Sequence, residues 1–215
     1  MTYKKEYFLE ILFFPFNYLI YSEILVNIIT YIFTINKNNL YKMYGQYYQQ
    51  NIAMARLNKE YQLCQDDQDL ITIGCNFGLE NNNIFKWRVT MLGPKNTPYE
   101  NGLFTISIEF PNDYPNHGPE FKFKNKIYHL NVVCDEKRAD FGHICINSIN
   151  SWKGTGSVKG RPGYAVKQAL LDIFCLFYKQ GVGSSYDEQM EYDYVNNQKK
   201  FEEDARAWTK QYAAM

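Results

Sequence analysis

Residues 86–110 read KWRVTMLGPKNTPYENGLFTISIEF, and this stretch decides the fold class. Apolar and polar residues alternate on both sides of a turn-rich centre, a period that is typical of strands with one buried face. Gly93-Pro94 and Pro111 end the two alternating runs. We therefore expect two antiparallel strands, whose buried residues are Trp87, Val89 and Met91 in the first and Phe104, Ile106, Ile108 and Phe110 in the second.

Helical periodicity surrounds this sheet signal on both sides, while Phe121 and Phe123 mark a third, shorter strand. An amphipathic helix with a charged outer face is expected from about Ile52 onward. Its apolar stripe consists of Leu57, Tyr61 and Cys64, which recur at helical spacing. A helix, then strands, then helices predict an α+β domain over residues 51–215. Two C-terminal helices are expected from the stripes Val166, Ala169, Leu170, Ile173, Phe174 and Phe177, and Phe201, Ala205, Trp208 and Tyr212.

Residues 1–50 form an apolar extension with a different composition. Phe, Ile, Leu, Tyr and Asn dominate residues 7–35. A membrane span needs about 20 mostly apolar residues, but the pieces 11–21 and 24–35 are shorter, and joining them would bury Glu23. Three interpretations stay open: a membrane anchor, an apolar arm that packs on the domain or on a partner, and sequence upstream of a mis-set start, with Met43 or Met54 as the true one.

Charge and cysteine content exclude several classes of protein. Lys and Arg number 23 and so do Asp and Glu, which leaves no basic footprint for nucleic acid. The five cysteines are widely spaced and form no C-x-x-C pair, so neither a disulfide framework nor a zinc knuckle is expected. We expect no metal or cofactor and a reducing compartment, cytoplasmic or nuclear, with membrane association if the apolar segment inserts. Core positions are the default for Cys64, Cys75 and Cys175, while Cys134 could be structural or reactive.

Residues 125–163 fit neither period, and irregular stretches of this length are often functional. They carry Tyr128-His129-Leu130-Asn131, Gly142-x-Ile144-Cys145 and Trp152. Before them come Gly93-Pro94, Thr97-Pro98-Tyr99, Gly102, Phe110-Pro111 and Tyr114-Pro115, and after them Pro162, Leu170-Leu171 and Ala205-x-x-Trp208-Thr209-x-x-Tyr212. In content and order, over roughly residues 52–215, these motifs resemble the ubiquitin-conjugating enzyme family.

The resemblance implies the ubiquitin-conjugating fold: an N-terminal helix, a four-stranded antiparallel meander and C-terminal helices. It implies that Cys145 takes the C-terminus of ubiquitin or a ubiquitin-like modifier from an activating enzyme as a thioester and transfers it to lysine, alone or with a ligase. Asn131 would stabilise the charge that develops on the carbonyl oxygen, either directly or by holding the loop that does. His129 is expected to support that loop by hydrogen bonding rather than act as a base, and Tyr128 is a further supporting residue.

Two departures from the family pattern surround these residues. Leu130 stands where the family has proline, so it restores a backbone N–H that needs a partner and loosens the turn. From His129 to Cys145 the chain advances 145 − 129 = 16 positions, more than is usual, through a charged run at 134–141 that we expect to be solvated. A second extra run, 153–160, separates Trp152 from Pro162, and both runs would flank the catalytic groove.

Substrate gating and ligase docking also differ in detail. Ser184 falls where the family carries a residue that gates the incoming lysine, although Ser184-Ser185 also suits a helix N-cap. Where the family inserts a hydrophobic residue into RING-type ligases, after Pro115, this chain has Asn116, which forgoes a burial worth roughly 1.5–3 kcal/mol for Phe. Pro162 keeps its place in the companion docking loop. We expect weaker or altered ligase docking.

Two other functions compete with an active enzyme. A catalytically weak or inactive scaffold of the same fold is suggested by Leu130, Asn116 and the two insertions, but the retained Cys145 and Asn131 favour activity. A metal-binding module has less support, because the spacing of its candidate ligands matches no common zinc pattern; those ligands would be His129, Cys134, His143 and Cys145.

Overall fold

The computed structural model describes residues 7–146 and 164–214, with side chains from residue 27 onward except at 164–165. The chain divides into two compact units, residues 1–48 and residues 49–215. Trp152, the run 153–160 and Pro162 lie outside the described residues.

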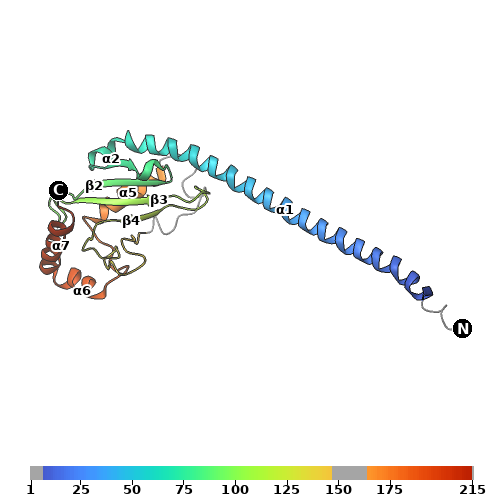
Figure 1. Ribbon diagram of the computed structural model, residues 1–215. Helices are drawn as coiled ribbons and strands as arrows, with labels where there is room; N and C mark the ends of the chain where they lie inside the picture. The colour runs from blue at the N-terminus through green and yellow to red at the C-terminus, as the bar shows by residue number, and fades with distance from the viewer. Residues whose placement is uncertain (1–6, 147–163, 215) are drawn as a thin grey trace. The chain divides into compact units, whose positions relative to one another are not determined.

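The second unit is built on a four-stranded antiparallel sheet in the order β1-β2-β3-β4 (Figure 1). The strands are β1 (Asn76–Leu79), β2 (Lys86–Leu92), β3 (Leu103–Glu109) and β4 (Glu120–Phe123), and the short 3₁₀ helix η1 (Glu80–Asn82) separates the first two. The α+β class, the meander and the three predicted strands are confirmed. The alternation did not predict β1, because that strand is four residues long and has no fully buried side chain.

The buried face of the sheet forms the core of the second unit. Trp87 pairs with Ile108 across β2 and β3, and both side chains are fully buried. Helix α5 (Tyr164–Leu176) covers this face (Figure 1), and just beyond its end the Phe177 ring lies 5.0 Å from that of Phe104. The predicted apolar stripe is confirmed, since Val166, Ala169, Leu170, Ile173 and Phe177 are buried and Phe174 is partly buried against the core.

The helix expected from Ile52 is the end of a longer helix, α1 (Tyr7–Gln65). No proline occurs between Pro15 and Pro94, so no missing N–H breaks the helix where the composition changes. Asp67 accepts hydrogen bonds from the N–H groups of Asp69 and Leu70, which caps the following helix α2 (Gln68–Thr72).

One charge of α1 lies inside the domain, contrary to the expected charged outer face. The Glu60 side chain is fully buried. Its carboxylate pairs with Arg56 at 2.7 Å and accepts a hydrogen bond from the Tyr114 hydroxyl at 2.8 Å. These two partners offset the cost of removing the carboxylate from water.

Two further helices, α6 (Glu188–Asn196) and α7 (Gln198–Tyr212), complete the second unit. Asp187 caps α6 by accepting a hydrogen bond from the Met190 N–H, so the N-cap is not at Ser184-Ser185. The chain after α7 returns to the sheet, where the Leu103 N–H donates to the Ala213 carbonyl at 2.7 Å.

The first unit is helical from Tyr7 onward, and it exposes several large apolar side chains, among them Tyr31, Phe33 and Tyr47. Within the described residues, no helix combines the length and the hydropathy needed to cross a bilayer. The three interpretations of residues 7–35 stay predictions.

Candidate functional site

His129 sits inside the turn that follows β4 and is almost fully buried. Its Nδ1 accepts a hydrogen bond from the Asn131 N–H at 3.0 Å, and its Nε2 lies 3.2 Å from the Leu176 carbonyl oxygen. Since a carbonyl only accepts, Nε2 carries the proton. Burial lowers the pKa of His129 to about 4, so the imidazole is neutral near pH 7. A neutral ring with both nitrogens engaged holds the turn in place.

The Asn131 side chain joins this turn to the segment after α5. Its Oδ1 accepts from the Gly181 N–H at 2.7 Å, and its Nδ2 donates to the carbonyls of Gly181 at 2.9 Å and Ser184 at 3.3 Å. A Cβ at residue 181 would lie 3.1 Å from Nδ2, so glycine permits this close approach. Only 1% of Asn131 is exposed. Of its two implied roles, this geometry favours holding the loop.

Cys145 is half-buried and attached to the same turn through the backbone. Its N–H donates to the Asn131 carbonyl at 2.8 Å, and the preceding residue, Ile144, bridges to Val132. Gly142 makes this path possible, because its φ is +77° and an added Cβ would lie 2.0 Å from the Phe123 carbonyl oxygen. The structure therefore brings His129, Asn131, Ser184 and Cys145 into one hydrogen-bonded region.

Tyr186 borders the cysteine, although the sequence did not indicate it. Its N–H donates to the Leu130 carbonyl at 3.1 Å. The pKa of Tyr186 is raised to about 12, first by burial and then by the charge of Cys145 and a hydrogen bond with it. The Arg138 guanidinium lies 5.6 Å from the Tyr186 ring centroid and forms two hydrogen bonds with Asp140. The charged run 134–141, largely exposed as expected, thus reaches the edge of the cysteine site.

The other four cysteines differ in exposure. Cys64 and Cys75 are buried, and burial raises the pKa of both thiols to about 12. Cys134 is half-buried and donates to the Ile127 carbonyl at 2.8 Å, which makes it structural. The core position expected for Cys175 is wrong, because Ile173 and Phe177 take the inward face of that segment and leave Cys175 exposed. In the part of the chain that the structure describes, no three His, Cys, Asp or Glu side chains are grouped as metal ligands.

The two docking residues that the structure describes lie in the loop before β4. Pro115 is half-buried and Asn116 is exposed, with its N–H bonded to the Asp113 carbonyl at 2.9 Å. Tyr128, the remaining supporting residue, packs its ring 5.2 Å from that of Phe201 in α7.

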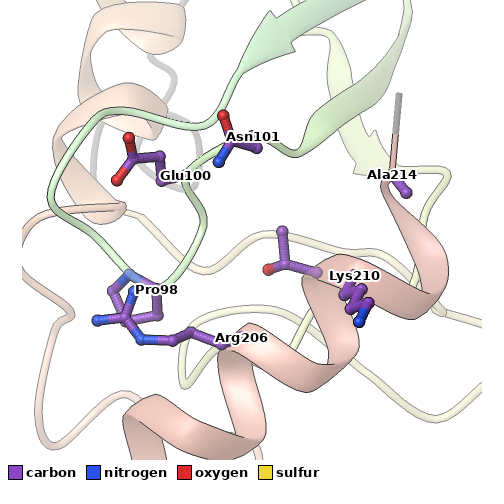
Figure 2. Close-up of a pocket in the computed structure, with 7 residues that line it drawn as sticks. Pro98, Glu100, Asn101, Arg206, Lys210 and Ala214 are labelled. Atoms are coloured by element: carbon purple, nitrogen blue, oxygen red, sulfur yellow. The ribbon is translucent and has the colours of Figure 1, made fainter.

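Two hollows differ in their relation to the cysteine turn. A small one of about 70 Å³ lies beside it and is lined in part by Leu130, Arg138 and Tyr186. A second, of about 520 Å³, lies between the loop before β3 and α7 (Figure 2), and none of the residues that hold Cys145 lines it. Its walls include Pro98, Glu100, Asn101, Arg206, Lys210 and Ala214.

Comparisons with known proteins agree on one family. The family model described as ubiquitin-conjugating enzyme matches residues 56–209. The Arabidopsis thaliana protein named "Probable ubiquitin-conjugating enzyme E2 31" is 34% identical over 161 residues, which are 75% of this chain and 94% of that protein.

Two solved structures show the same likeness. A "putative ubiquitin conjugating enzyme" from Plasmodium yoelii superposes with a TM-score of 0.63 and 30% identity, over 76% of this chain and 96% of that one. The E2 domain of a Toxoplasma gondii ubiquitin conjugating enzyme gives 0.57 and 29%, over 74% and 97%. Because the matched region holds both the meander and the cysteine turn, this chain belongs to the ubiquitin-conjugating enzyme family, the E2 transferases that work with ubiquitin, an activating enzyme and ligases.

Proposed function

We propose that Cys145 carries ubiquitin, or a related modifier, as a thioester and delivers it to lysine. The Cys145 thiolate attacks the thioester carbonyl on the activating enzyme, and that enzyme's cysteine leaves as a thiolate. A lysine amine then attacks the carbonyl carbon of the new thioester, so that an isopeptide bond forms, the bond between that carbon and the Cys145 sulfur breaks, and Cys145 is released as a thiolate. The amine passes its proton to water in this step.

One observation carries the proposal: the Cys145 N–H is bonded to the Asn131 carbonyl, which joins the candidate nucleophile to the candidate oxyanion loop. The Asn131 amide is occupied by the backbone at Gly181 and Ser184. Asn131 therefore acts by fixing the two loops on either side of the thioester. Ser184 is exposed, and in this proposal it gates the incoming lysine.

A loading assay with the full chain tests the proposal. The protein is incubated with an activating enzyme, ATP and ubiquitin, and gels are run with and without thiol. We expect a thiol-sensitive adduct that Cys145→Ala abolishes. Cys175→Ala is the matched control, because it removes an exposed thiol outside the site and should load normally. No adduct with ubiquitin or any related modifier would refute the proposal and favour the scaffold.

The Asn131→Ala variant separates loading from transfer. It should still form the thioester but discharge it to lysine more slowly, by up to the order of 100-fold that the loss of one direct oxyanion donor costs. Equal discharge rates in the variant and the wild type would remove Asn131 from the mechanism.

Ligase docking through the loop before β4 is proposed to be weak, because Asn116 in that loop is exposed and polar. Asn116→Phe should tighten binding to a RING domain by about tenfold or more, given the apolar area that it adds. Binding can be measured by titration of a labelled RING domain, and Asn112→Phe, at another exposed position of the same loop, is the control.

A further inference from the structure

The Leu130 N–H is a buried donor that the family's proline would not have. Leu130 is 1% exposed, and a buried N–H without a partner is costly. The partner is the side chain of Gln180, whose Oε1 accepts the hydrogen bond at 2.8 Å although the two residues are 50 positions apart.

The orientation of the Gln180 amide is fixed by its second partner. Gln180 is buried, and its Nε2 donates to the Tyr99 hydroxyl oxygen at 2.6 Å. The Tyr99 hydroxyl donates its own hydrogen bond to the Tyr128 carbonyl at 2.8 Å, so it can only accept a hydrogen bond from Gln180. A flipped amide would place Nε2 against the Leu130 N–H, donor against donor. Gln180 is thus held with its oxygen toward residue 130.

Gln180 and its neighbour Gly181 bind two consecutive residues of the turn. Gln180 binds the backbone of Leu130, and Gly181 binds the side chain of Asn131 through both its N–H and its carbonyl. Asn131 in turn holds the backbone of Cys145. We infer that Gln180 is a positioning residue for the thioester site, which fixes the Leu130 turn in place of the absent proline. The inference rests on the proposed function of Cys145.

A double-mutant cycle on the full chain tests the pairing without any modifier. Gln180→Met keeps the length of the side chain but orphans the Leu130 N–H, and should lower the melting temperature by roughly 2–10 °C. Leu130→Pro removes that N–H, and the turn accommodates proline in the family. The double variant lacks both the N–H at position 130 and the amide at position 180, so neither group is left without its partner. The loss of stability in the double variant should therefore be smaller than the sum of the losses in the two single variants. Additive losses would overturn the pairing.

Gln168→Met is the matched control for the cycle. Gln168 also donates an amide hydrogen bond, to Asp172 at 2.8 Å within α5, but it has no link to the turn. Its loss should combine additively with Leu130→Pro. Coupling as strong as that of Gln180 would mean that the cycle reports general softening of the domain, and would overturn the inference.

Single-turnover kinetics separate positioning from mere stability. Gln180→Met should load to the wild-type extent at a temperature well below its melting point but discharge to lysine about tenfold more slowly, and Leu130→Pro should restore the discharge rate. Loading and discharge that fall together, or no restoration, would overturn the positioning role. If the wild type itself does not load, the proposed function fails, and the unfolding cycle alone decides whether Gln180 supports the turn.

Discussion

Acidification from pH 7 to pH 5 should destabilise this protein through His129. The pKa of the folded imidazole is about 4 because of burial, whereas an unfolded histidine has a pKa of about 6.5. The unfolded state therefore binds more protons between these values, so stability is fully present above about pH 6.5 and is lost as the pH falls toward 4.

The size of the effect follows from the two pKa values. At pH 5 about 97% of unfolded but only about 9% of folded molecules carry the proton on His129, which favours unfolding by about 2 kcal/mol. At pH 7 the same calculation gives about 0.2 kcal/mol. Glutamine at position 129 cannot be protonated, so His129→Gln should remove nearly all of this difference while keeping a polar side chain.

Urea unfolding at pH 7 and pH 5, followed by tryptophan fluorescence, measures this difference for both proteins. The other titratable groups are common to both and cancel in the comparison. The loss of unfolding free energy should be smaller in His129→Gln by about 2 kcal/mol. Equal losses, or an imidazole NMR signal of folded His129 that titrates near pH 6.5, would refute the assignment of a buried, neutral ring.

Three further predictions concern the cysteine site. Gly142→Ala should lower the free energy of unfolding by about 2 kcal/mol or more, because the residue has a positive φ and its Cβ would meet the Phe123 carbonyl; an unchanged urea midpoint would contradict this. Tyr186→Phe removes a hydroxyl that is hydrogen-bonded to Cys145, so the free energy of unfolding should fall by about 1 kcal/mol, as measured by urea unfolding; an unchanged urea midpoint would refute the contact. Thiol labelling of the native protein should modify the accessible Cys145 and Cys175 well before the buried Cys64 and Cys75. The reverse order would contradict the packing.

The sheet could be predicted from the sequence because burial on one face imposes a period of two. Trp87, Val89 and Met91 display that period over a full strand, and all three are buried. The residues of β1 are too few to display it. The core position assigned to Cys175 neglected information that the sequence did contain. Ile173 and Phe177 lie on the inward face, and a residue two positions from each is rotated by about 200° to the opposite side of a helix.

Only part of the candidate site could be predicted from the sequence. Leu130 revealed a donor that needed a partner, but no local rule places Gln180 against it, because the contact joins residues 50 positions apart. Tyr186 was missed for a similar reason, since its proximity to Cys145 depends on how the chain returns after α5. Residue-type patterns identify groups that carry chemistry, while the tertiary fold alone identifies the groups that hold them.

The hydrogen-bond partners of the turn make the inactive-scaffold alternative weaker. Leu130 was an argument for a loosened, inactive turn, yet its N–H is bound by Gln180 and its carbonyl by Tyr186. Asn131, one residue later, has both ends of its amide engaged. A turn tied to the following segment at successive residues has lost little of the rigidity that proline would give it. Of the two substitutions that suggested a scaffold, Leu130 and Asn116, the one without such compensation is Asn116, which lies at the proposed ligase surface rather than at Cys145.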